Sequence, residues 1–126
     1  MFDIYLATPY SHPNKGVMQS RYVAITHLSV DLALSGYSVY SPITHWHEAA
    51  NWRDLDTNFQ FWKKQCLDAV AACHVLVVHC IDGWEDSKGV SAEVKEAERL
   101  GKPIVYFSPD AALEFSKKLQ EALSIR

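Results

Sequence analysis

The stretch from Cys80 to Gly101, CIDGWEDSKGVSAEVKEAERLG, constrains the fold of this chain more than any other. The apolar run Val75 to Val78 precedes it and is typical of a buried strand, and a helical pattern starts near Val90. In open α/β sheets the carboxyl end of a strand and the next helix start form a ligand crevice, because free N–H groups and the helix dipole converge there. The stretch therefore predicts a strand, a binding loop and a helix.

The rest of the chain alternates in the same way. Strands are expected at 2–7, 37–40, 74–80 and 103–107, and helices at 17–35, 59–73, 90–100 and 110–123. We expect Gly36 to cap the first helix and Asp110 to begin the last. Strands that alternate with helices predict a small doubly wound α/β fold, Rossmann- or flavodoxin-like, with a parallel sheet of four to five strands and helices on both faces.

Residues 43–58 carry no sustained period and are expected to form a loop, either a substrate lid or a surface excursion. Within it His45 and His47 flank Trp46, but two imidazoles without an evident third ligand are a weak metal signal, and we expect no metal. Trp46, Trp52 and Trp84 have flat faces that suit a nucleobase, and packing in the core or at a dimer interface explains each of them equally well.

Length and composition set the class of protein. With 126 residues the chain is expected to form one domain, 1–126, since domains commonly have about 100–150 residues. No stretch approaches the roughly 20 apolar residues of a membrane span, and no signal peptide is evident, so we expect a cytoplasmic protein without a membrane partner. The net charge of −3 and the scattered lysines and arginines argue against a nucleic-acid polymer as partner.

Short motifs give the chain a family resemblance. They are Ile4 to Ala7 (IYLA), Asp68, and Ser87 to Glu93 (SKGVSAE). With them the chain resembles the nucleoside 2-deoxyribosyltransferase-like superfamily, which includes the nucleoside 5′-monophosphate N-glycosidases, and within it the small bacterial and phage domains of the DUF1937 type. The resemblance covers nearly the whole chain in element order. It implies an enzyme that needs no cofactor, binds a nucleotide or nucleoside, and forms a homodimer or higher homo-oligomer.

The resemblance also implies roles for single residues. By position, Glu93 corresponds to a nucleophile that attacks the anomeric carbon, and Tyr5 to a tyrosine whose hydroxyl lies beside that carboxylate. Asp68 corresponds to an acid that assists the leaving base. Ser87, with Gly89 and Val90, resembles the SxGVxxE pattern with which the monophosphate hydrolases hold the 5′-phosphate.

The expected reaction is cleavage of the N-glycosidic bond of a (2′-deoxy)nucleoside 5′-monophosphate. Transferases that exchange bases on deoxyribose have an aspartate at the position of Ser87, and here Asp86 lies one place earlier, so transfer stays open as an alternative. A non-catalytic nucleotide-binding module is the alternative from another class. In that case Glu93 is an ordinary first-turn glutamate and Ser87 an ordinary helix cap.

The chemistry of the residue types agrees with the expected reaction. Glycosidic cleavage develops positive charge on the sugar, which a carboxylate stabilises or bonds to, while a second acid helps the base depart. A hydroxyl and backbone N–H groups at a helix start suit a phosphate, and Gly89 permits close approach. Further candidates for substrate binding are Asp86, Lys88, Tyr10, Ser11, Arg21, His45 and Trp46.

Overall fold

A four-stranded parallel sheet forms the centre of the protein. The computed structural model describes residues 1–55 and 59–125. Its strands are β1 (Phe2–Ala7), β2 (Val39–Tyr40), β3 (Cys73–His79) and β4 (Ile104–Phe107), in the order β2-β1-β3-β4. In the register, Tyr5 on β1 pairs with Tyr40 on one side and with Leu76 on the other. The predicted parallel α/β sheet is confirmed.

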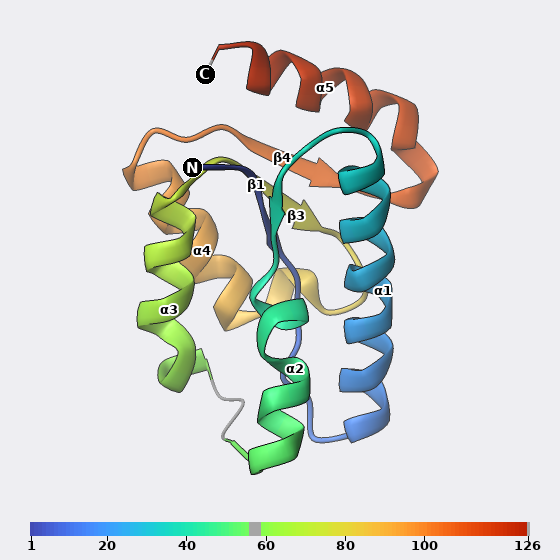
Figure 1. Ribbon diagram of the computed structural model, residues 1–126, viewed down its shortest axis with the longest axis vertical. Helices are drawn as coiled ribbons and strands as arrows, with labels where there is room; N and C mark the ends of the chain where they lie inside the picture. Colours follow the sequence, from blue (N-terminus) through green and yellow to red (C-terminus); the bar gives the residue numbers. More distant parts are fainter. Residues whose placement is uncertain (56–58, 126) are drawn as a thin grey trace.

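Within the described residues, five α-helices surround the sheet: α1 (Lys15–Leu34), α2 (Pro42–Arg53), α3 (Phe59–Ala71), α4 (Lys88–Arg99) and α5 (Ala112–Ser124). Alternate strand residues point to opposite faces, so β1 directs Ile4 and Leu6 to one core and Tyr5 and Ala7 to the other. The first core is closed by α1 and α5, and the second by α3 and α4. Figure 1 shows α3 and α4 on the side of the strands opposite α1, as a doubly wound fold requires.

The helix ends show which local signals the chain uses. Gly36 follows α1 with a φ of 98°, in the left-handed region that glycine tolerates, as expected. At α5 the prediction is wrong, because Asp110 does not cap the helix. It lies in a 3₁₀ turn, Pro109–Ala111, where the Ala111 N–H bonds to the Ser108 carbonyl at 3.0 Å, and α5 begins one residue after that.

The largest departure from the sequence prediction is α2, which occupies most of the expected loop 43–58. Ser41 caps the helix through a 3.2 Å bond from the Thr44 N–H, and Pro42 takes the first turn, where its missing N–H costs nothing. The helix ends at Asp54, which adopts left-handed φ and ψ. The expectation also covers residues 56–58, which lie outside the described residues.

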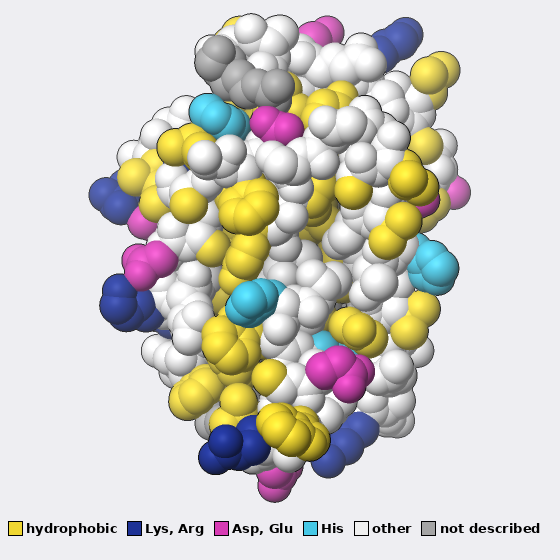
Figure 2. All heavy atoms as spheres, viewed as in Figure 1, with side chains coloured by type: hydrophobic (Ala, Val, Ile, Leu, Met, Phe, Trp, Pro, Cys, Tyr) yellow, Lys and Arg dark blue, Asp and Glu magenta, His cyan; other side chains and the backbone are white. Residues whose placement is uncertain are grey.

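Charges on the surface do not gather by sign on the face that Figure 2 shows. In this view lysine, arginine, aspartate and glutamate side chains lie mainly toward the edges, with both signs mixed, and apolar side chains lie over much of the centre. None of the described helices is both long and apolar enough to cross a membrane.

Candidate functional site

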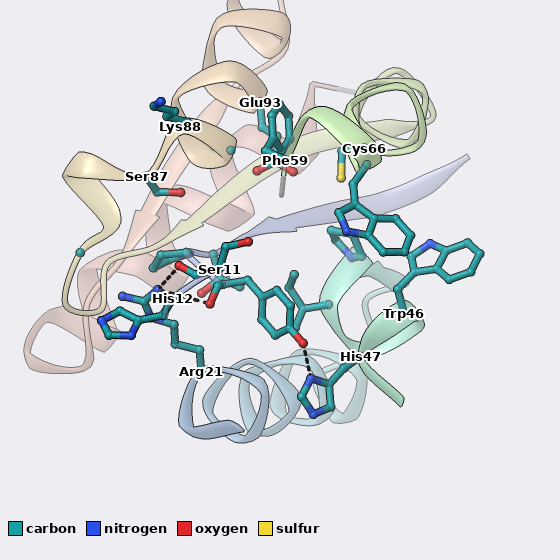
Figure 3. A pocket seen from close by; sticks show the side chains of 18 of the residues that line it. Ser11, His12, Arg21, Trp46, His47, Phe59, Cys66, Ser87, Lys88 and Glu93 are labelled. Carbon is teal, nitrogen blue, oxygen red and sulfur yellow. Dashed lines mark hydrogen bonds between the residues drawn. The ribbon is translucent and has the colours of Figure 1, made fainter. Parts of the chain in front are cut away.

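A cavity of about 580 Å³ lies at the carboxyl ends of the strands. Its walls come from residues 8–12 after β1, from one side of α2, from the first half of α3 and from residues 83–93 around the start of α4. This is the crevice in which open α/β sheets bind ligands. Figure 3 shows Ser87, Lys88 and Arg21 toward one end of it and Trp46 toward the other.

Glu93 is the buried acid of this cavity. Its side chain lines the cavity although the residue is only 4 % exposed, and it receives a hydrogen bond from the Tyr5 hydroxyl at the centre of β1. Burial raises the pKa of the Glu93 carboxyl to about 8, against the hydrogen bonds of Tyr5 and Cys66, which lower it. The pKa of Tyr5 rises because of its own burial and the Glu93 charge. The structure thus joins the two residues that the resemblance placed together.

Cys66 completes the buried cluster, and the sequence did not point to it. Its thiol lines the cavity from α3, and burial, with the Glu93 charge as a lesser cause, raises the pKa of Cys66 to about 12. Phe59, Trp62 and Cys66 are spaced three and four residues apart and all three line the cavity. This spacing in the sequence could have predicted which face of α3 lies against the cavity. The three cysteines are all free.

The structure does not bring Asp68 to Glu93. Asp68 lies two residues beyond Cys66, and at 3.6 residues per turn this places it on the opposite side of α3. Its side chain is 68 % exposed and forms an ion pair with Lys64 at 2.7 Å. The motif position suggested an acid in the cavity, but the rotation of the helix directs this one to solvent.

The polar end of the cavity is built around the start of α4. The Ser87 Oγ accepts a 3.2 Å bond from the Val90 N–H as the helix cap, and Lys88 and Asp86 line the cavity beside it. Gly89 lines the cavity as well. A Cβ there would lie 3.1 Å from the Phe59 ring, so the glycine also makes room for α3 to pack on the start of α4.

Arg21 joins the two loops of the polar end. Its guanidinium donates to the carbonyls of Ser11 at 3.2 Å and of Tyr10 at 3.4 Å in one loop, and of Asp82 at 3.2 Å in the other. Gly83 approaches it so closely that a Cβ would lie 2.8 Å from Nη2. Among residues 1–55 and 59–125, no carboxylate forms an ion pair with Arg21. Its positive charge is therefore available to an anion in the cavity.

The opposite end of the cavity is aromatic. Trp46 on α2 and Trp62 on α3 contact each other with ring centroids 5.2 Å apart, whereas Phe59 lies nearer Glu93 (Figure 3). His45 is exposed and does not line the cavity, whereas His47 does. Trp52 and Trp84, the other two candidates for stacking, also lie outside the lining. In the part of the chain that the structure describes, no three His, Cys, Asp or Glu side chains are grouped to hold a metal ion.

A family model described as Domain of unknown function (DUF1937) matches residues 2–109. The chain belongs to the DUF1937 family. The matched span includes all four strands and every residue that lines the cavity, and it ends before α5. The search of curated proteins gave no significant match.

Proposed function

We propose that this DUF1937 domain cleaves the N-glycosidic bond of a (2′-deoxy)nucleoside 5′-monophosphate and releases the free base and the sugar phosphate. One observation carries the proposal: the buried Glu93 carboxyl, bonded to Tyr5, lies in a cavity with a cationic end and an aromatic end. A nucleotide has the same order of parts, because its sugar stands between an anionic phosphate and a flat base.

In the proposed reaction the Glu93 carboxylate acts on the anomeric carbon. The bond from that carbon to the base nitrogen breaks and the base leaves with the electron pair, while the carboxylate bonds to the carbon or stabilises its positive charge. Water then adds to the carbon, and any bond from the carbon to Glu93 breaks with its electron pair returning to the carboxylate. The proton of the water passes to the base or to the solvent. Because the pKa of Glu93 is about 8, only a part of the enzyme carries the carboxylate at neutral pH.

Tyr5 prepares the nucleophile for this step. Its hydroxyl donates to Glu93 and so favours the charged form, which lowers the pKa that burial raises. Tyr5 belongs to the second core and Glu93 is itself buried, so the hydrogen bond between them orients the carboxylate at the cavity.

The 5′-phosphate is assigned to the polar end. Ser87 and Lys88 lie at the start of α4, where the N–H groups and the helix dipole favour an anion, and Arg21 adds a cation without a carboxylate partner among the described residues. The base is assigned to the aromatic end, where Trp46 and Trp62 provide faces for stacking.

Base exchange on deoxyribose is the second candidate. The observation that favours it is the Asp86 carboxylate, which lines the polar end and would accept hydrogen bonds from the hydroxyls of an unphosphorylated sugar.

A homodimeric state and a cytoplasmic location stay predictions. Analytical sedimentation tests the first, and cell fractionation tests the second.

Chromatography of free base tests the proposal. The protein is incubated with the common deoxynucleosides and their 5′-monophosphates, with and without a second base, beside Glu93→Gln and the control Glu98→Gln, which alters an exposed glutamate of the same helix. We expect base release from monophosphates by the wild type and the control but not by Glu93→Gln. Exchange on free nucleosides would establish the transferase instead, and no reaction would leave a binding module.

A further inference from the structure

A tyrosine and a histidine from distant parts of the chain meet at the cavity wall. Tyr10 follows β1 and His47 lies on α2, and both line the cavity. The Tyr10 Oη is 2.5 Å from the His47 Nδ1, the contact that the dashed line at His47 marks in Figure 3. The mechanism proposed above uses neither side chain, so the purpose of this short contact is open.

The surroundings of His47 hold its ring neutral and in one orientation. The residue is 3 % exposed, and its ring stacks on Tyr22 with centroids 3.9 Å apart and planes within 13°. Burial lowers the pKa of His47, and the Glu48 charge opposes this more weakly. At the far nitrogen, Nε2, the nearest group is the Gln19 Oε1 at 2.9 Å, followed by the Asn51 Nδ2 at 3.2 Å.

The distances favour one direction for the hydrogen bond from Tyr10. The Gln19 oxygen is closer to Nε2, at 2.9 Å, than the Asn51 nitrogen at 3.2 Å, and it favours the proton on Nε2, which leaves the lone pair of the neutral ring on Nδ1. A phenol is also a stronger acid than a neutral imidazole N–H, so the phenol donates. Burial raises the pKa of Tyr10, with the Glu48 charge as a lesser cause, and the phenol keeps its proton for this bond.

We infer that the Tyr10 Oη is a fixed hydrogen-bond acceptor that selects nucleobases with an exocyclic amino group. Its only proton is given to His47, so toward the cavity the oxygen offers lone pairs alone. An amino group on adenine or cytosine can donate to it. The carbonyl oxygen that replaces the amino group in hypoxanthine or uracil would meet another acceptor and lose its water without a new partner.

The position of Tyr10 agrees with this role. Trp46 precedes His47 on α2, so the aromatic end assigned to the base and the histidine that orients Tyr10 belong to the same helix. The inference rests on the proposed function for its placement of the base. The selection itself acts on binding, and it can be measured without turnover.

The test compares matched nucleotides. Base release is measured with 2′-deoxyadenosine against 2′-deoxyinosine 5′-monophosphate, and with 2′-deoxycytidine against 2′-deoxyuridine 5′-monophosphate. Calorimetry measures the Kd of the same four compounds for Glu93→Gln protein. The variants are Tyr10→Phe, which removes the acceptor, His47→Phe, which keeps a ring against Tyr22 but frees the Tyr10 proton, and the control Tyr106→Phe on β4, outside the cavity.

We expect the wild type to prefer the amino member of each pair, and either Tyr10→Phe or His47→Phe to reduce that preference roughly tenfold, the effect of one hydrogen bond of about 1.4 kcal/mol. Tyr106→Phe should keep it. Discrimination in binding without base release would uphold the inference and refute the proposed function. Turnover with the same preference in Tyr10→Phe as in the wild type would refute the inference alone, and neither binding nor turnover would refute both.

Discussion

The two sides of the cavity are built in different ways. Glu93 on α4 lines one side, and we call it, together with the Tyr5 hydroxyl of β1 behind it, the floor. Their hydrogen bond joins two buried residues that are 88 positions apart. Trp46 and His47, which we call the α2 wall, belong to a helix that follows a strand of only two residues and begins at the Ser41 cap. The floor is therefore fixed by the fold itself, whereas the wall is fixed by a helix added beside it.

This difference separates two tasks. A nucleophile needs one geometry, and the core supplies it because any movement of β1 against α4 disrupts packing on both. Base selection needs a surface that can differ without disturbing the sheet, and a helix held through its cap and through side chains of α1 is such a surface. We therefore expect changes in the floor to alter the chemistry and the stability, and changes in the wall to alter mainly the choice of substrate.

The largest expected effect is on stability, from Glu93→Gln. Between pH 4.5 and about 8 the folded protein holds a proton on Glu93 that the unfolded chain has released, so the free energy of unfolding falls as the pH rises through this window. The glutamine side chain of the variant carries no proton to release, so its unfolding free energy does not fall in this way. At pH 9 we expect Glu93→Gln to exceed the wild type in unfolding free energy by a few kcal/mol, since each unit of pKa shift corresponds to about 1.4 kcal/mol.

Urea denaturation of both proteins at pH 4 and pH 9 measures this difference. The advantage should be small at pH 4, where the carboxyl is protonated in both states. An advantage that does not grow with pH would show that Glu93 ionises in the folded protein as an ordinary glutamate does.

The second effect is on the pH dependence of base release. If the carboxylate is the reacting form, kcat/KM rises about tenfold per pH unit below the pKa of Glu93 and levels off above about 8. Tyr5→Phe removes the hydrogen bond that lowers this pKa, so its curve should lie at higher pH and its rate at pH 7 should fall roughly tenfold. Equal curves for the two proteins would contradict the role given to Tyr5.

A smaller effect is expected from Ser41→Ala in the wall. The variant loses the cap bond to the Thr44 N–H, which costs about 1 kcal/mol of unfolding free energy. Because α2 carries His47, the preference between matched amino and carbonyl nucleotides should weaken, while kcat on the preferred substrate changes less than about threefold. Thermal denaturation and rate measurements check the two parts. A loss of kcat without a loss of preference would mean that the wall also positions the nucleophile.

The smallest effect is expected from Asp68→Asn. Asp68 is exposed, and its ion pair with Lys64 is an exposed one that contributes little to stability. We expect kcat/KM to change by less than about twofold and the unfolding free energy to stay close to that of the wild type. A loss of activity of a hundredfold would return Asp68 to the reaction, for instance as a residue that reaches the cavity of a second copy of the chain.

The sheet and the end of α1 were predictable because their signals are local. The continuous apolar run of β3 and the glycine after α1 each depend on a few neighbouring residues.

The helix α2 was missed because several of its inward residues are polar or aromatic. His47 is buried and Trp46 is half-buried, so no aliphatic period marks the helix. Ser41 and Pro42 were a usable start signal, since a serine before a proline is typical of a helix N-terminus.

The site was predictable only in part, for a related reason. Glu93 and Ser87 belong to one contiguous motif, and the structure places both at the cavity. The acid on α3 was assigned by position to Asp68, and a shift of two residues on a helix reverses the face. Tyr10 and His47 are 37 residues apart, and nothing in either segment alone indicates that they meet.

The most direct test of the central claim is the rate of base release from a deoxynucleoside 5′-monophosphate by wild-type protein and by Glu93→Gln at pH 8.5. At this pH more than half of the wild type carries the Glu93 carboxylate. We expect steady release of free base by the wild type and a loss of about a thousandfold or more in the variant. Equal rates in the two proteins would contradict the assignment of Glu93 as the nucleophile.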